Sequence, residues 1–452
     1  MDRIVDRERL GSLMEREEAR FLAEHARSGE LFERGKRHLL AGVPMPWMSE
    51  WAGPYPVFVA EAEGARFTDV DGHEYVDFCL GDTGAMTGHA PKEAVAAIAE
   101  QAAKGITLML PSEDSLWVGQ EMARRFGLPF WQFCLTATDA NRFTLRLARA
   151  ITGRPKILVY SWCYHGSVDE TIAVAEAGTT IARPGNIGPA VDPAVTTRAV
   201  EFNDVAALEE ALAHEDVACV LAEPALTNIG IVLPEPGYHD TLRELTRTHG
   251  TYLVIDETHT ICAGPGGATK AWGLEPDFVT IGKPLASGVP AACYGMSEEA
   301  AEKANAYMRT LPTTDVGGVG GTLSGNALSL AAMRATLEHV LTDEAFERMI
   351  GLGARWTDGV KAAIERRGLP WEVQRLGCRA EYWFCPSPPR TGGEAAESDD
   401  HELARFTHLY ALNRGILLTP FHNMALMSPA TTAEDVDRHS AVFDEMCGEL
   451  TG

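Results

Sequence analysis

The chain has 452 residues, of which 45% are hydrophobic and 23% charged, the balance of an ordinary globular protein. This length exceeds a single typical core, so we expect a large domain together with a smaller one. The 39 basic and 64 acidic side chains give a formal net charge of −25, which argues against nucleic acid or an anionic membrane as a partner.

The sequence shows no pattern for membrane insertion, disulfide bonding or metal binding. No apolar stretch is long enough to span a bilayer, and the first residues lack the apolar core of a signal peptide. The nine cysteines are scattered, as expected for reduced thiols in a cytoplasmic protein. Neither His214-Glu215 nor His401-Glu402 has the second histidine of a zinc-binding helix, so no metal is expected.

Residues 1–75 are predicted to combine a helix and a hairpin. Charged residues with helical apolar spacing extend to about residue 40 and indicate a surface or subunit-contact helix. After an aromatic, proline-rich loop, residues 57–60 and 66–79 are predicted as short strands. We expect this segment to belong to the small domain and the dimer contact.

Residues 76–330 form the predicted large domain, which is of the α/β class. Five apolar runs alternate with helical segments here, and this alternation predicts a mostly parallel sheet covered by helices on both faces. The runs are 133–135, 157–160, 217–221, 252–255 and 278–281. Ligands of such sheets bind beyond the carboxyl ends of the strands.

Residues 331–452 form the predicted smaller domain, of α+β type. A helix at about 326–340 leads into it, and residues 378–384 alternate as in a strand. The polar, proline-rich segment 386–400 is predicted to be an exposed excursion.

An acid and a lysine follow two successive apolar runs of the large domain. Asp256 ends the run 252–255, and Lys283 follows the run 278–281. A buried acid needs a cationic partner, and a protonated pyridine nitrogen is one. A lysine can bond covalently to an aldehyde. Together they predict pyridoxal 5′-phosphate (PLP) as the cofactor, with Lys283 and Asp256 catalytic, although a lone lysine is more often a surface residue.

Two other strand ends supply candidates for the phosphate and the ring of the cofactor. Ala137 and Thr138 open a helix after the run 133–135, and the N–H groups of a helix start bind anions, so they are predicted to hold the phosphate. Tyr164 follows the run 157–160 and is predicted to stack on the ring as a further catalytic residue. Taken alone, these residues also fit an ordinary N-cap and a core tyrosine.

Four polar residues complete the predicted cofactor site. Glu223 and Asn228 follow the run 217–221, where they orient catalytic groups or, equally, satisfy loop backbone. Thr258 and His259 follow Asp256 and are expected against the ring and near its hydroxyl. A lone histidine is more often a satisfied polar group than a catalyst, so His259 is secondary.

The glycine-rich loop at 320–326 offers a second anion-binding segment at a helix start. It lacks the third glycine of a dinucleotide-binding loop and follows no clear strand. A nicotinamide cofactor is therefore not expected.

In this order, the segments resemble the class III (subgroup II) PLP-dependent aminotransferases of fold type I, particularly the glutamate-1-semialdehyde aminomutase-like branch. The matching segments are 67–78, 88–91, 223–230, Asp256-Glu257, Lys283 and 321–326. The resemblance extends from about residue 35 onward. It implies a mostly parallel seven-stranded sheet flanked by helices, a smaller α+β domain and Lys283 as the Schiff-base lysine. It also implies a homodimer in which Thr322 reaches the phosphate of the neighbouring subunit.

The expected activity is that of a transaminase, which moves an amino group from an amine or amino acid to a keto acid or ketone by a ping-pong mechanism through Lys283. The aminomutase of this family carries an arginine in its N-terminal loop to hold the substrate carboxylate, and the matching place falls near Met48. Trp47, Met48 and Trp51 are predicted to line an apolar substrate pocket or to pack at the dimer interface. Arg379 is an alternative carboxylate binder, and otherwise forms a surface salt bridge.

Three alternatives stay open beside the transaminase. A glutamate-1-semialdehyde 2,1-aminomutase-like isomerase would move nitrogen within one molecule and need no separate acceptor. A PLP racemase, epimerase or decarboxylase would use the same fold. A non-catalytic regulator would need a DNA-binding extension or a lost lysine, and this acidic chain shows neither.

Overall fold

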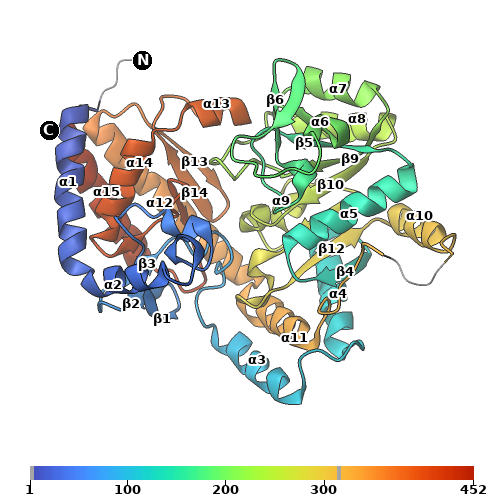
Figure 1. Ribbon diagram of the computed structural model, residues 1–452, viewed down its shortest axis with the longest axis horizontal. Coiled ribbons are helices and arrows are strands. Elements are labelled where there is room, and N and C mark those ends of the chain that lie inside the picture. Colours follow the sequence, from blue (N-terminus) through green and yellow to red (C-terminus); the bar gives the residue numbers. More distant parts are fainter. Residues whose placement is uncertain (1–4, 313–316) are drawn as a thin grey trace. The chain divides into compact units, whose positions relative to one another are not determined.

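The computed structural model describes residues 5–312 and 317–452, which divide into two compact units (Figure 1). Unit 1 is assembled from three stretches of the chain, and unit 2 is almost one continuous stretch. Unit 1 comprises residues 1–91, 347–388 and 398–452, and unit 2 comprises residues 92–346 and 389–397.

A seven-stranded sheet forms the centre of unit 2, with the strand order β4-β12-β11-β10-β9-β5-β8. The strands are β4 Phe130–Cys134, β5 Lys156–Tyr160, β8 Thr197–Val200, β9 Val217–Ala222, β10 Tyr252–Asp256, β11 Phe278–Ile281 and β12 Ala292–Met296. Neighbours from β8 to β11 pair in parallel, whereas β12 pairs antiparallel with both β11 and β4. The predicted mostly parallel sheet of an α/β fold is confirmed.

All five predicted apolar runs are strands of this sheet, but two further strands were not predicted. The strand β8 carries Thr197 and Arg198 among its four residues, and β12 contains Gly295, so neither reads as an apolar run. The β12 glycine has a packing reason, because a Cβ atom there would lie 2.6 Å from the Trp131 ring of β4. Small and polar residues inside a covered sheet hide such strands from a search for apolar runs.

Helices flank the sheet of unit 2 (Figure 1). The longer ones are α3 Lys92–Lys104, α4 Glu113–Phe126, α5 Ala137–Thr152, α7 Val205–Ala213, α8 Tyr238–Thr248, α10 Glu298–Met308 and α11 Ala327–Ala335. The short ones are α6 Pro193–Thr196, α9 Gly267–Ala271 and α13 Gly392–Glu397, and a small hairpin pairs β6 Ala173–Glu176 with β7 Thr179–Ala182. The helix predicted at 326–340 is α11, which continues as a π-helical turn at Thr336–Val340.

Unit 1 contains two small sheets and four long helices. One sheet has the order β1-β2-β3-β15 and the other β13-β14-β16. The strands are β1 Val59–Glu63, β2 Arg66–Asp69, β3 Glu74–Asp77, β13 Glu372–Leu376, β14 Arg379–Trp383, β15 Ile416–Leu417 and β16 Met424–Leu426. The helices are α1 Arg7–Glu24, α12 Asp343–Arg367, α14 His401–Leu412 and α15 Ala433–Thr451, with the shorter α2 Ala26–Gly35 after α1.

Residues from both ends of the sequence meet in the core of unit 1. The Glu17 carboxylate of α1 is 1% exposed, and it accepts hydrogen bonds from Asn413 at 2.8 Å and Arg414 at 3.1 Å. Phe21 packs in the same cluster as Leu409. Since a buried carboxylate is stable only when it is paired, α1 depends on the segment after α14 for its place in the fold.

The segment 386–400 differs from its prediction as an exposed excursion. It carries α13, where Ala395 is 3% exposed and the Gly393 N–H donates to Glu201 at 3.1 Å within unit 2. Gly392 lies so close to the Ser161 carbonyl that a Cβ atom there would approach it to 2.2 Å. Among the helices of residues 5–312 and 317–452, none is both long and apolar enough to cross a membrane.

Candidate active site

Asp256 lies at the carboxyl end of β10 and is held by three residues from other parts of unit 2. Its Oδ2 atom accepts a hydrogen bond from Asn141 Nδ2 at 2.8 Å and lies 2.9 Å from His165 Nδ1. Its Oδ1 atom accepts from the Thr258 N–H at 3.1 Å. Asp256 is 3% exposed and His165 is 1% exposed, so this pair is screened from water.

Burial alone would raise the pKa of Asp256, but the bonds from His165, Thr258 and Asn141 outweigh it and hold that pKa below its usual value. For His165, burial alone would lower the pKa, whereas Cys163 and the Asp256 carboxylate raise it well above the ordinary value. The favoured state is therefore a carboxylate beside an imidazolium. Asp256 keeps its negative charge in an interior where a neutral acid would otherwise be favoured.

Sequence reasoning identified Asp256 but missed Asn141 and the role of His165. Asn141 is fully buried in the first turns of α5, where it also donates to the His165 carbonyl oxygen at 3.1 Å. Its own Oδ1 accepts from the Thr280 hydroxyl of β11 at 2.6 Å. Asn141 thus joins α5, β10 and β11 around one carboxylate. The available signal was an amide on the apolar face of a helix that opens with the predicted phosphate residues.

Lys283 lies where β11 ends, next to the histidine that was predicted to be secondary. Lys283 Nζ is 2.7 Å from His259 Nε2. The register Asp256↔Thr280 brings the ends of β10 and β11 side by side, so the acid and the lysine leave the same edge of the sheet. Lys283 has a left-handed backbone (φ +45°) and begins a short 3₁₀ turn. A non-glycine residue in this region stores strain, which is typical of functional positions.

The start of α5 has the features of an anion site. Thr136 and Asp139 form a capping box, and the N–H groups of Ala137 and Thr138 have no acceptor one turn earlier because the helix begins there. The Thr138 hydroxyl accepts from the Ser167 N–H at 3.1 Å. A Cβ atom at Gly166 would lie only 2.1 Å from Thr138 Oγ1, so the loop after Tyr164 packs tightly against the helix start. This arrangement places the predicted phosphate and ring residues together.

The other predicted cofactor residues lie on adjacent loops of unit 2. Tyr164 is 40% exposed, with the Arg183 guanidinium 6.0 Å from its ring centroid. Glu223 is buried and accepts from the Thr227 hydroxyl, and Asn228 donates to the Trp162 carbonyl oxygen at 3.1 Å. Thr258 and His259 are 6% and 8% exposed. An exposed aromatic ring, an anion site and a persistently charged acid are the donor set that PLP requires.

The predicted substrate residues belong to unit 1. Trp47 is 46% exposed and meets Phe421 edge-on, with ring centroids 6.4 Å apart, whereas Met48 and Trp51 are half-buried. Arg379 does not form the surface salt bridge expected as its alternative role. Its side chain is fully buried, 3.4 Å from Glu381 and 3.8 Å from Asp82. All five residues of β14 are buried, so the strand has no exposed face on which Arg379 could form a surface salt bridge.

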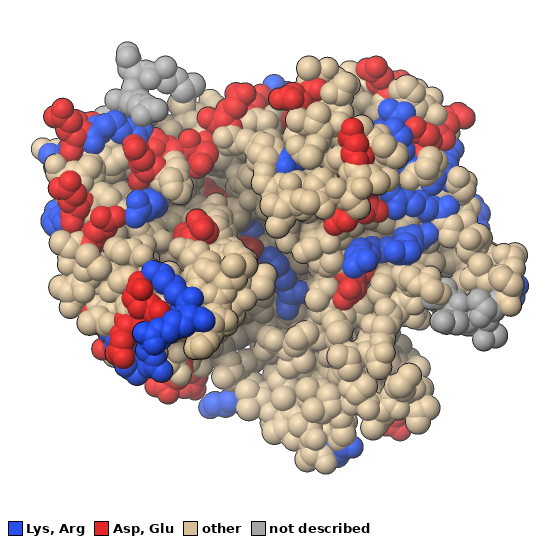
Figure 2. Space-filling model, viewed as in Figure 1, with Lys and Arg blue, Asp and Glu red and all other residues tan. Residues whose placement is uncertain are grey.

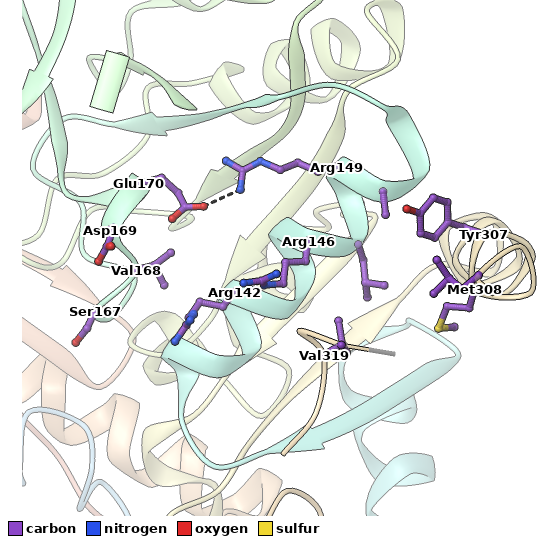
Figure 3. Close-up of a pocket in the computed structure, with 14 residues that line it drawn as sticks. Arg142, Arg146, Arg149, Ser167, Val168, Asp169, Glu170, Tyr307, Met308 and Val319 are labelled. Carbon is purple, nitrogen blue, oxygen red and sulfur yellow. Dashed lines mark hydrogen bonds and ion pairs between the residues drawn. The ribbon is translucent and has the colours of Figure 1, made fainter. Parts of the chain in front are cut away.

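A cavity of about 730 Å³ runs along the outer face of α5 (Figure 3). Arg142, Arg146 and Arg149 project into it from that helix, and Arg149 pairs with Glu170 at 2.6 Å. Lys and Arg side chains gather over this part of unit 2 in the space-filling view (Figure 2). Lys283 and Asp256 are not among its lining residues, whereas Ser167, which donates to Thr138, is.

Known proteins resemble this chain along nearly all of its length. The glutamate-1-semialdehyde 2,1-aminomutase of Sorangium cellulosum is 35% identical over 426 residues, which are 92% of this chain and 95% of the relative. A solved glutamate-1-semialdehyde-aminomutase from Pseudomonas aeruginosa PAO1 is 52% identical with a TM-score of 0.96 and covers 99% of both chains. A lysine-to-alanine variant from the same organism, solved in complex with PMP, is similar to the same degree.

These relatives correct the expected reaction. They are named as aminomutases, which are isomerases, so the prediction of a ping-pong transaminase is wrong. The family and the PMP complex confirm the prediction of a PLP cofactor. The protein is an enzyme acting on small-molecule substrates. Because residues 47–444 match its family description, the chain belongs to the aminotransferase class-III family.

Proposed function

We propose that the protein is a PLP-dependent aminomutase that moves the amino group of glutamate 1-semialdehyde from carbon 2 to carbon 1. The observation that carries the proposal is the likeness to a solved glutamate-1-semialdehyde-aminomutase over 99% of both chains at 52% identity. The product with the same atoms is 5-amino-4-oxopentanoate. The reaction needs no second amino donor or acceptor, because nitrogen leaves and re-enters one carbon skeleton.

The residues of unit 2 have distinct proposed tasks in this reaction. When bound, PLP supplies an aldehyde for the amino group and a ring that accepts electrons. Asp256 holds a negative charge for the ring nitrogen, and its pKa remains low because His165 and Asn141 donate to it. Lys283 Nζ carries the proton between the two reacting carbons, and His259 at 2.7 Å orients the amine.

The remaining tasks are binding and orientation. Ala137 and Thr138 offer N–H groups for the phosphate, and Tyr164 covers one face of the ring. Asn228 fixes the loop that bears Tyr164, through its bond to the Trp162 carbonyl. Glu223 is proposed to orient groups beside the ring from the end of β9.

A homodimer with Thr322 acting in trans is part of the proposal. Thr322 is exposed in the single chain. A residue that reaches another subunit must be exposed when its own subunit is considered alone. Residues 317–321 of the same loop line a concave surface together with Arg142 and Arg146 of α5. Val319 also lines the cavity into which these arginines project (Figure 3). Since the chain carries a net charge of −25, a basic surface suits a second copy. Sedimentation of wild type and Arg142→Glu tests this, with dissociation into monomers expected for the variant.

The decisive experiment supplies glutamate 1-semialdehyde alone to the cofactor-loaded enzyme and measures 5-amino-4-oxopentanoate. We expect sustained turnover without an added oxo acid or amine. Lys283→Ala is expected to lose about 1,000-fold or more in kcat, because no other amine replaces the proton carrier. Lys270→Ala, an exposed lysine of α9, is the matched control and should keep wild-type turnover. Turnover that requires an added oxo acid would contradict the proposal.

The substrate carboxylate needs a separate measurement, because the resemblance implies an arginine in the N-terminal loop and the matching place here falls near Met48. We propose Arg379 as the alternative partner, although Glu381 and Asp82 already lie near it. Comparing glutamate 1-semialdehyde with its carboxamide analogue tests carboxylate recognition. A preference of about tenfold or more for the acid is expected, since a charged hydrogen bond contributes about 1.5–3 kcal/mol. Equal kcat/KM values would rule out a cationic partner.

A further inference from the structure

A compact group of metal-type ligands lies in unit 1, within the part of the chain that the structure describes. His25, Asp69 and His73 each offer one ligand atom, and these atoms lie within 4.8 Å of one another. His25 stands at the corner between α1 and α2, Asp69 ends β2, and His73 follows in the turn before β3. Spacing along the sequence did not reveal the group, because His25 is distant from the other two residues.

The protein holds two of the three ligands in a fixed orientation from the side opposite the shared centre. His25 Nδ1 lies 2.9 Å from the Phe21 carbonyl oxygen, which can only accept, so the proton of this ring sits on Nδ1 and Nε2 faces inward. Asp69 Oδ1 accepts from the N–H groups of Asp71 and His73, both at 2.9 Å, so Oδ2 faces the histidines. Such outer bonds are typical of metal-ligating side chains.

The Tyr75 hydroxyl makes short contacts with two of the three ligand residues. The Tyr75 hydroxyl is 2.7 Å from both Asp69 Oδ2 and His25 Nε2, but it has only one proton to donate. One of the two short contacts therefore joins atoms that both present lone pairs. Either a second proton or a cation must lie there.

Two of the three spacings between the ligand atoms match those around a tetrahedral metal ion. Metal–ligand bonds of about 2.0–2.1 Å place tetrahedral ligands about 3.3 Å apart. His73 Nδ1 lies 3.2 Å from Asp69 Oδ2, and His25 Nε2 lies 3.6 Å from it. The two imidazole rings have centroids 4.7 Å apart and are tilted by 46°, so both can face one centre. His73 is 37% exposed in its side chain and provides the route of entry.

From this geometry we infer that His25, Asp69 and His73 form a binding site for a divalent transition metal ion of the zinc type, with the Tyr75 oxygen beside the fourth position. Two imidazoles and one carboxylate suit such an ion better than magnesium or calcium, which prefer oxygen ligands alone. Asp71 also receives the N–H groups of Arg27 and Ser28 at the start of α2. A bound ion would therefore fasten the α1–α2 corner to the β2–β3 hairpin.

The test is a zinc titration of the full-length, cofactor-loaded protein after chelator treatment, in competition with a chromophoric chelator. Wild type should bind one more zinc ion per chain than His73→Gln, and the affinity of this site should fall by about 100-fold or more in that variant. His339→Gln, an exposed histidine beside Glu338, is the control and should bind like wild type. Zinc should also raise the melting temperature of wild type and His339→Gln, but not of His73→Gln.

Cobalt substitution distinguishes metal binding at this site from metal binding by the cysteines. Cobalt(II) at this site should give visible absorption without the sulfur charge-transfer bands of a thiolate ligand, and that absorption should vanish in His73→Gln. If His73→Gln matched wild type in zinc stoichiometry, affinity and thermal shift, the inference would be overturned.

Discussion

Asp256 and Glu257 are neighbours in sequence and both are buried, yet their surroundings drive their protonation in opposite directions. The Asp256 pocket contains the His165 imidazole, and the pKa of Asp256 is lowered. The Glu257 carboxylate accepts hydrogen bonds from the Thr260 hydroxyl and from the N–H groups of Ala268 and Thr269, which are neutral donors. Burial dominates there, and the pKa of Glu257 is raised.

The contrast teaches that burial alone does not decide the charge of an acid. A strand sends successive side chains to opposite sides, so one residue reaches the sheet edge that carries Lys283 and the next reaches α9. Gly267 faces Glu257 so closely that a Cβ atom would approach its carboxylate to 2.3 Å. The surroundings of Asp256 stabilise its negative charge, whereas Glu257 fixes the start of α9.

The largest effect should come from Asp256→Asn, which removes the permanent charge while keeping the side-chain shape. We expect kcat to fall by about 100- to 1,000-fold, the range for losing one preorganised electrostatic contact in an active site. Single-turnover kinetics on the PLP-loaded enzyme would measure it. Activity within threefold of wild type would show that this charge is not part of the reaction.

Asn141→Ala should have a smaller effect of the same kind, because it removes one of the bonds that lower the pKa of Asp256. We expect kcat to fall by about tenfold, as for the loss of a hydrogen bond to a charged group. The acidic limb of the pH–rate profile should move to higher pH. Thr144→Val removes a bond to the Asn141 carbonyl in the same helix and should leave the profile unmoved.

Unlike the two substitutions above, Glu257→Gln should lower the stability of the protein and leave its catalysis nearly unchanged. One carboxylate oxygen is replaced by an NH₂ group that faces donors, so we expect the free energy of unfolding to fall by about 1–3 kcal/mol. Urea unfolding would measure this loss. The kcat of the folded variant should stay within about twofold of wild type, and a large fall would place Glu257 in the reaction.

The smallest effect should be a difference between wild type and Glu257→Gln in how the free energy of unfolding depends on pH. The raised pKa of Glu257 means that the folded protein binds this proton more tightly than the unfolded chain. Its contribution to stability is therefore full below the unfolded pKa and declines as pH rises through the folded pKa. The stability advantage of wild type over Glu257→Gln should shrink as pH rises from 4.5, by about 1.4 kcal/mol for each unit of the raised pKa. An advantage that grows with pH would contradict this account.

The sequence allowed prediction of the residues that follow strands, because a strand end fixes the edge of the sheet. Asp256 and Lys283 were found in this way, and their adjacency follows from the pairing of β10 with β11. Asn141 was not found, since its partner Asp256 lies 115 residues away. Only the docking of α5 on the sheet shows which turn of the helix meets β10.

The residues that bind the cofactor do not identify which reaction the enzyme catalyses. Lys283 and Asp256 support many reactions on one cofactor, so they fix the chemistry and not the fate of the amino group. The absence of an arginine near Met48 favoured a transaminase. The likeness of the whole chain to a solved aminomutase shows that this prediction was wrong. Likewise, Arg379 was placed at the surface because strand β14 was assumed to have one exposed face.

The division of unit 1 into three stretches has a consequence for biosynthesis. Glu17 emerges from the ribosome early, but its partner Arg414 is translated 397 residues later. Unit 2 is nearly continuous and can complete its sheet while the tail is still being made. During that interval α1 presents Phe21 without its partner Leu409. The apolar face of α1 is thus expected to be prone to aggregation until the segment after α14 has been made.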